Sequence, residues 1–142
     1  MPTFKHGKNA DFSLDGSAAT LVNISNTLNS INMPRAIETA ETTAFGSQDK
    51  TYITGLSGAT ISLAGMFDAT VDGNISTAIT HLKSGSFASL SFQYGPSGSA
   101  TGLPKFTGEA LITSYDLSSP VGDTITYSLE LQVTGAVTQS TF

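Results

Sequence analysis

The clearest pattern in the chain is a strict alternation of apolar and polar residues from Thr124 to Thr134. A period of two is typical of a β-strand with one buried face. At about 3.3 Å per residue this strand would span roughly 36 Å, far more than an average strand. Its apolar face would carry Ile125, Tyr127, Leu129, Leu131 and Val133, and its polar face Thr124, Thr126, Ser128, Glu130, Gln132 and Thr134.

Weaker alternation recurs in other segments, which are rich in Thr and separated by Gly-containing breaks. These features predict a mainly β fold. The strand expected over 108–117 carries apolar residues on both of its faces, so both should be partly buried. The remaining predicted strands cover residues 59–68, 87–94, 11–14, 20–24 and 35–41.

One segment follows a helical period instead. This helix would begin at a capping residue, Asp72 or Asn74, and end at Gly85 in a left-handed conformation. A cation, Lys83, would lie in its last turn. The helix should lie across one face of the sheet, because it has a single apolar stripe. The stripe is formed by Ile75, Ala78, Ile79 and Leu82.

The segment 42–57 is predicted to be a long loop, because it combines glycines and polar residues with only a few apolar ones. Loops of this length inside a compact domain are often functional. A second loop, GPSGSATGLP, is expected at 95–104, and the small, polar ends at 1–10 and 136–142 are predicted to be terminal arms.

Length and charge restrict the classes of function. The 142 residues are enough for a single domain. Eleven acids against six bases argue against a general nucleic-acid binder. The chain has neither an apolar run long enough for a transmembrane helix nor an apolar stretch after Lys5 and Lys8, so no membrane segment or secretory signal is expected. Without cysteine there is no disulfide and no thiolate site.

The surface is expected to carry little charge. Only 12% of the residues are charged, against about 25% in typical soluble domains. Ser and Thr together make up 39 of the 142 residues. Such a composition favours a protein whose surface largely contacts other copies of itself. The alternative is a small β protein that is polar without being charged.

The sequence carries no recognisable catalytic or metal-binding set. His6 and His81 have no acid at the spacing of a metal site or catalytic triad, and both are predicted to be surface residues. The segment DATVDGN around Asp68 and Asp72 resembles a calcium loop only in part, and a turn with a helix cap explains it better. Phosphate-loop and dinucleotide fingerprints are absent. No enzyme activity, metal or cofactor is therefore expected.

The order of these segments resembles a known family. The stretch FGSQDKTYITGLSGATISLAGMFD (45–68) is followed by a helix like NISTAITHLKSG, a Pro/Gly loop, a strand like FTGEALITSYDLSSPVGD and a long last strand ending in Thr-Gly. This arrangement, over about 11–137, is similar to that of phage major tail proteins, the tail-tube subunits of long-tailed phages. Families of this type also include the needle tubes of secretion systems and contractile tails.

The resemblance implies a β-sandwich or barrel-like subunit with one helix. Subunits of this family form hexameric rings that stack into a hollow tube for DNA, with tape-measure, terminator and baseplate proteins as partners. A place in the virion tail, after assembly in the host cytoplasm, would follow. The long loop 42–57 and the terminal arms would make contacts between rings, with Phe45, Tyr52 and Leu56 as anchors.

The polar face of the strand at 124–134 has two possible places in such a tube. It could line the lumen, where Glu130, its only charge, would repeat in every subunit as an acidic ring that repels DNA phosphates. DNA would then pass without specific binding. Alternatively, this face could be the outer, solvent side of the sheet.

Other functions are compatible with a small β protein. A capsid decoration or head–tail connector protein is a second structural hypothesis. A carbohydrate-binding β-sandwich would usually stack sugars on exposed aromatic rings, and this chain has no Trp. A small hydrolase is disfavoured because the catalytic set is missing.

Overall fold

The computed structural model describes residues 7–15 and 21–142 of the chain. The predictions for residues 1–6, which include His6 and most of the N-terminal arm, and for Thr20 lie outside these ranges. Short 3-10 helices cover Gly7–Asn9 and Ser25–Thr27. The other elements are β1 (Asp11–Asp15), β2 (Leu21–Asn23), β3 (Leu28–Asn32), β4 (Arg35–Glu41), β5 (Tyr52–Met66), α1 (Ala69–Ser84), β6 (Leu90–Gly95), β7 (Pro104–Ser118) and β8 (Thr126–Thr141).

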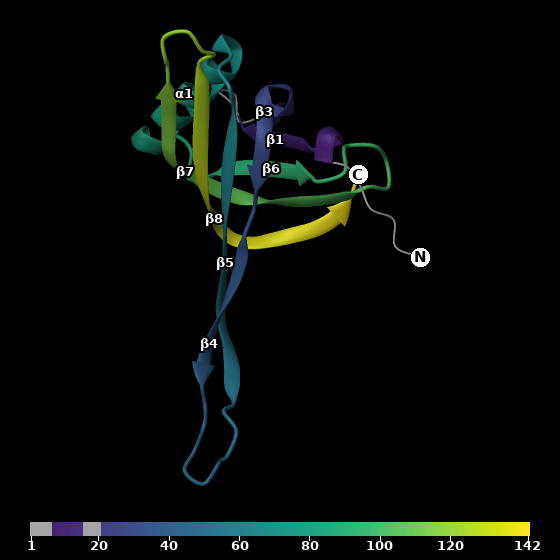
Figure 1. Ribbon diagram of the computed structural model, residues 1–142, viewed down its shortest axis with the longest axis vertical. Coiled ribbons are helices and arrows are strands. Elements are labelled where there is room, and N and C mark those ends of the chain that lie inside the picture. Colours follow the sequence, from purple (N-terminus) through teal and green to yellow (C-terminus); the bar gives the residue numbers. More distant parts are fainter. Residues whose placement is uncertain (1–6, 16–20) are drawn as a thin grey trace.

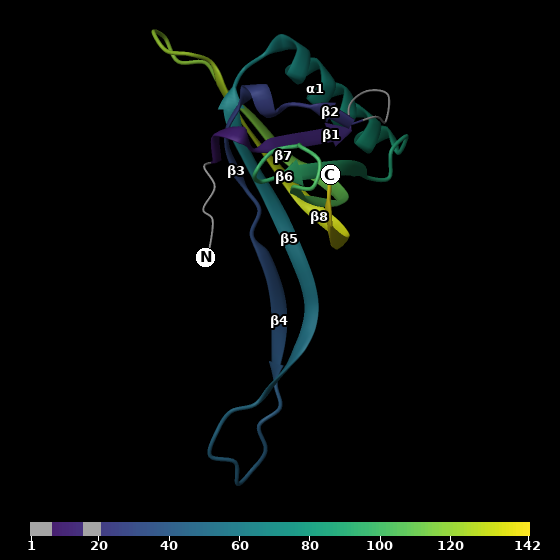
Figure 2. The same ribbon diagram turned by 90° about the vertical axis from the view of Figure 1, so that its right-hand side faces the viewer.

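The strands form an antiparallel sheet in the order β2-β1-β6-β7-β8-β5-β3, and β4 pairs with the outer part of β5. The sheet curls into a half-barrel, and α1 lies against it (Figures 1 and 2). The expected class, a mainly β, barrel-like fold with one helix, is therefore confirmed.

A bulge lies where β7 and β8 bend across the half-barrel. From the pair Glu109–Thr134 to the pair Thr107–Thr138, β7 changes by two residues while β8 changes by four. The additional residues begin at Gly135, whose φ of 85° suits glycine. Bulges of this kind increase strand bending and twist, which accounts for the strong curl here.

The alternation in the last strand has the predicted consequence. Tyr127, Leu129, Leu131 and Val133 are buried, and the residues between them are exposed. The buried side chains form one core between the sheet and the helix. Its other members are Phe12, Leu14, Ile24, Ala59, Ile61, Leu63, Val71, Ile75, Ala78, Leu90, Phe92 and Ala110.

The helix begins earlier than expected, at Ala69. Its N-cap is Asp68, which has extended backbone angles and accepts a hydrogen bond of 3.2 Å from the Val71 amide. The proposed caps Asp72 and Asn74 are wrong, because both lie inside the helix. The C-terminal stop is confirmed, since Gly85 has a φ of 80°.

Several strand boundaries also differ from the prediction. The last strand begins at Thr126, so Thr124 and Ile125 precede it, and it continues to Thr141. The expected C-terminal arm at 136–142 is therefore wrong, because residues 138–141 pair with 104–107 of β7. The Thr-Gly break at 134–135 is a bulge and not the end of the strand. β3 was not predicted, since its sequence LNSIN has too few apolar residues.

The loop predicted at 42–57 is wrong over its C-terminal part, which is a strand. Residues Tyr52–Ser57 belong to β5, and only 42–51 connect the two strands. The alternation was hidden because β5 gains one residue relative to β4 between the pairs Ile37–Ser57 and Thr39–Thr54. The result is a long two-stranded hairpin that leaves the half-barrel (Figure 1).

Candidate assembly surfaces

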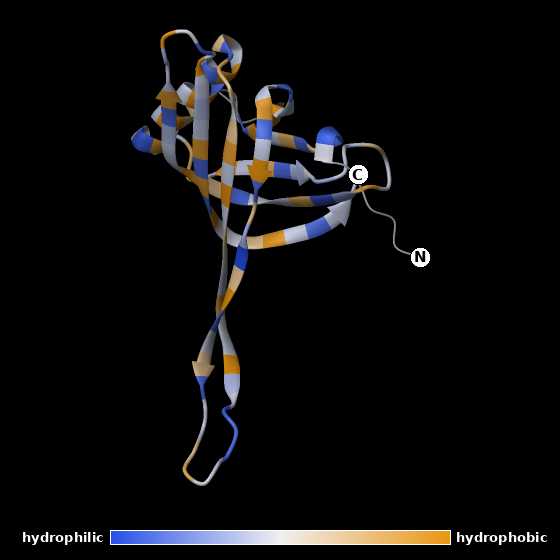
Figure 3. Cartoon of the chain, in the orientation of Figure 1, coloured by the Kyte–Doolittle hydropathy of each residue, from blue (hydrophilic) through white to orange (hydrophobic). Residues whose placement is uncertain are grey.

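The hairpin, here called the arm (residues 35–59), carries large apolar side chains in solvent. Every residue of β4 is exposed, and so are the first seven residues of β5. Phe45 at the tip is 110% exposed, Leu56 80% and Tyr52 56%. Hydrophobic positions recur along the arm and at its tip in Figure 3. An isolated two-stranded ribbon is marginally stable in water, so these side chains indicate a surface for another chain.

The apolar residues occupy both faces of the arm. Tyr52 lies opposite Glu41 in the register and shares its face. Leu56 lines a hollow together with Ala36 and Glu38, which alternate onto the other face of β4. Of the three predicted anchors, Tyr52 and Leu56 are therefore on opposite faces, and Phe45 is in the loop 42–51 between the two strands, here called the tip loop.

The root of the arm is held by three contacts. The Thr60 amide donates a hydrogen bond of 3.2 Å to the Pro34 carbonyl. The side-chain amide of Gln132 donates to the carbonyl of Ala59 at 3.1 Å, where β5 passes from β8 to β4. On the other side, the Arg35 guanidinium lies 5.2 Å from the centre of the Phe106 ring. These contacts fix the direction in which the arm leaves the half-barrel.

A second surface is the polar face of β5, β8 and β7, opposite the core. Four of the five predicted residues, Thr126, Ser128, Glu130 and Gln132, share this exposed face. Thr124 does not, because it lies in the turn before β8, where its amide donates to the Asp123 carboxylate at 2.7 Å.

The polar face is more acidic than the sequence pattern of β8 alone indicated. In the register Ser128 pairs with Asp116 and Thr134 with Glu109, so both acids share the face with Glu130. Residues 52–66, 108–118 and 126–141 contain no Lys or Arg, and the one cation of β7, Lys105, lies near its start, 5.3 Å from the centre of the Phe142 ring. The hollow that contains Glu38 is also lined by Thr60 and Gln132, so this acidic surface continues onto the arm.

The titratable side chains of the described residues are scattered with respect to metal binding. Within 7–15 and 21–142, no three His, Asp or Glu side chains are grouped to hold a metal. His81 packs against the ring of Phe87 with centroids 4.5 Å apart. No helix in the described part is long and apolar enough to cross a membrane.

Residues 11–139 match the family model for the phage tail tube protein. The chain belongs to the phage tail tube protein family. It is a structural subunit that builds a tail with other copies of itself, a component of the virion and not an enzyme. This assignment decides against a decoration protein, a sugar-binding domain or a hydrolase. Comparison with curated protein sequences found no match.

Solved structures share the fold of this tail tube protein. The tail of an empty gene transfer agent particle, refined with C6 symmetry, aligns with a TM-score of 0.77 at 20% identity, over 96% of this chain and 99% of that chain. The native gene transfer agent virion gives 0.76 at 25% identity, over 96% and 99%. The SPP1 tail tube gives 0.73 at 14% identity, over 98% and 80%.

Proposed function

We propose that six copies of this tail tube subunit close into a ring and that stacked rings form the channel through which DNA leaves the particle. The family assignment and the C6 symmetry of the gene transfer agent tail support the number of copies. The low charge of the chain, 12% of its residues, supports extensive burial between copies.

The polar face of β5, β8 and β7 lines the lumen in this proposal. The observation that carries it is that this exposed face holds Glu109, Asp116 and Glu130, against a single cation, Lys105, near the start of β7. Closure of a ring would repeat each acid once per subunit. Stacked acidic rings repel phosphates at short range, so DNA would move through without binding to the wall.

The arm makes the contacts between rings. Its exposed Phe45, Tyr52 and Leu56 act as anchors that become buried against neighbouring copies. Because Tyr52 and Leu56 are on opposite faces, the arm is suited to lie between two partners. Tape-measure, terminator and baseplate proteins are the further partners that the family implies.

Electron microscopy of the purified protein tests this function. Concentrated protein should form rings about one subunit thick, or tubes, in negative stain. Mass measurement should give a multiple of six copies. A 14.7 kDa monomer at every concentration and in several salts would contradict the proposal.

A further inference from the structure

The exposed apolar side chains gather at two ends of the molecule. Eleven large hydrophobic residues are exposed in the described part. Only Leu21 and Leu111 lie away from the two ends. Five are on the arm, namely Ile37, Phe45, Tyr52, Ile53 and Leu56, and four are at the opposite end, namely Met66, Leu117, Val121 and Ile125. These last four are here called the end patch.

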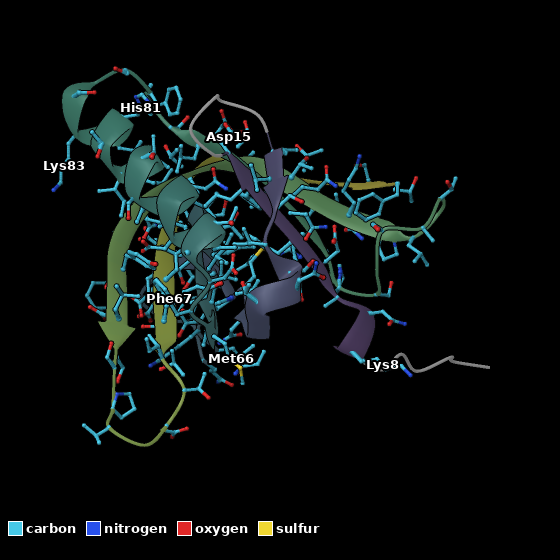
Figure 4. All side chains as sticks on the ribbon, turned by 90° about the horizontal axis from the view of Figure 1, so that it is seen from above. Lys8, Asp15, Met66, Phe67, His81 and Lys83 are labelled. Atoms are coloured by element: carbon cyan, nitrogen blue, oxygen red, sulfur yellow. The ribbon has the colours of Figure 1, made fainter. Side chains whose placement is uncertain are left out.

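The residues of the end patch lie where β5 and β7 end and β8 begins. Met66 pairs with Thr126, and Thr126 pairs with Ser118, the last residue of β7. The Phe67 amide donates to the Ile125 carbonyl at 2.9 Å, which holds the β7–β8 turn beside the end of β5. Figure 4 views this end, with Met66 and Phe67 labelled near the strands that lead into the turn.

The composition of the patch is unusual for the place it occupies. Val121 is 104% exposed at the tip of a turn, where polar residues usually stand. Leu117 is 51% exposed and lines a hollow of about 280 Å³ with Gly65 and Tyr127. Neither side chain contributes to the core of its own subunit, so both are available to another chain.

We propose that the end patch receives the arm tip of a second copy in the next ring, with Phe45 seated against Leu117, Val121 and Ile125. This contact rests on the stacked-ring function proposed above. The arm and the patch lie at opposite ends of the long axis (Figure 1). A contact between two different ends of identical chains is head-to-tail, and it repeats into an open filament unless its rotation closes it into a ring.

The charges near both ends favour an apolar contact. Around the patch are Asp116 and Asp123, and residues 111–130 contain no Lys or Arg. The tip loop carries Asp49 and Lys50, preceded by Glu41 at the end of β4. Lys50 is the only cation in the tip loop and in residues 111–130, so at most one ion pair can form there, and added salt, which screens the net repulsion of the acids, should promote stacking.

Cross-linking gives the direct test. The chain has no Cys, so a double variant with Phe45→Cys and Val121→Cys carries the only two thiols. Treated with a short bismaleimide after tube assembly, the double variant should give a ladder of covalent multimers. Each single variant should stay monomeric on a denaturing gel. Cross-linked dimers from Phe45→Cys alone would mean that arms meet arms and would overturn the proposal.

Point variants separate this contact from ring formation. Val121→Asp should raise the protein concentration needed for tubes about tenfold or more, because a charge would be buried in the contact. Val121→Ile and the exposed helix variant Ser76→Asp should assemble normally. If Val121→Asp forms tubes as readily as the wild type does and no ladder appears, the proposed contact is wrong while the tube function stands. If the wild type forms no ring or tube, the function itself fails.

Discussion

The phenolic hydroxyl of Tyr115 donates a hydrogen bond of 2.8 Å to the carboxylate of Asp72. This bond joins β7 to the first turn of α1, the only helix longer than one turn in the described part. Burial, and then the bond to Asp72, raise the pKa of Tyr115 above its ordinary value of 10. The hydroxyl is therefore a neutral donor at neutral pH. The carboxylate of Asp72 is engaged here, while Asp68 caps the helix.

Replacing Tyr115 by Phe should destabilise the subunit by about 1–3 kcal/mol, since the bond to a charged group is lost and the packing is kept. Urea unfolding followed by circular dichroism measures this difference. Tyr52→Phe, on the exposed arm, is the matched control and should change the midpoint little. Equal midpoints for Tyr115→Phe and the wild type would show that the bond does not hold the helix.

Alkaline pH should weaken the fold through the same tyrosine. Because the pKa of Tyr115 is raised in the folded state, its contribution is complete below about pH 10 and is lost as pH rises further. Burial raises the pKa of Tyr127 and Tyr94 in the same direction. The free energy of unfolding should therefore fall above pH 10, and less steeply in Tyr115→Phe. An identical slope in both proteins would contradict this assignment.

The parts of the fold that depend on local periodicity were predictable from the sequence. The core face of β8 and the stripe of α1 follow from regular spacing over many residues. The arm was missed because the bulge opposite Glu38 interrupts the alternation of β5. The acids Asp116 and Glu109 were missed as members of the polar face, because their placement depends on register across two strands. β7 gains a residue between Ile112 and Ser114, which a single strand pattern does not reveal.

Gly65 should be among the least replaceable residues of the subunit. A Cβ there would clash with the carbonyl oxygen of Thr27 and lie 2.9 Å from the Cα of Leu28, both backbone atoms. Gly65→Ala must therefore push β3 away from β5, and we expect a loss of about 2–4 kcal/mol. Gly58→Ala is the control, because a Cβ at Gly58 has no atom within 4 Å. Thermal unfolding of both variants measures the contrast, and equal melting temperatures would refute the close approach.

Reversing the charge of Glu130 tests the lumen. Glu130→Lys should leave folding intact, because an exposed substitution shifts stability by less than about 0.5 kcal/mol. In the proposed tube it places a ring of cations on the wall, which should slow DNA ejection. Ejection is followed by fluorescence of a DNA dye on particles assembled with the variant. Glu130→Gln, which removes charge without reversing it, should eject at nearly the normal rate. Normal ejection with Glu130→Lys would place this face outside the tube.

Shortening the arm tests whether it connects rings. Deleting residues 46–51 leaves Thr42 to Phe45 between the paired Glu41 and Tyr52, a connection of four residues that hairpins commonly use. The half-barrel and its core do not include the deleted residues, so circular dichroism and melting temperature should be nearly unchanged.

The same deletion should stop tubes from growing, because it removes most of the tip loop and shifts Phe45 relative to a neighbouring ring. Electron microscopy would then show single rings or free subunits in place of tubes.

A replacement of 46–51 by six Gly and Ser residues keeps the length of the loop and serves as the control. Growth with this replacement would assign the contact to the apolar residues that remain, Phe45 above all. Loss of growth in both variants would assign it to the deleted residues themselves. An unfolded deletion variant would instead mean that the tip supports its own subunit, and normal tubes would remove the arm tip from the contact between rings.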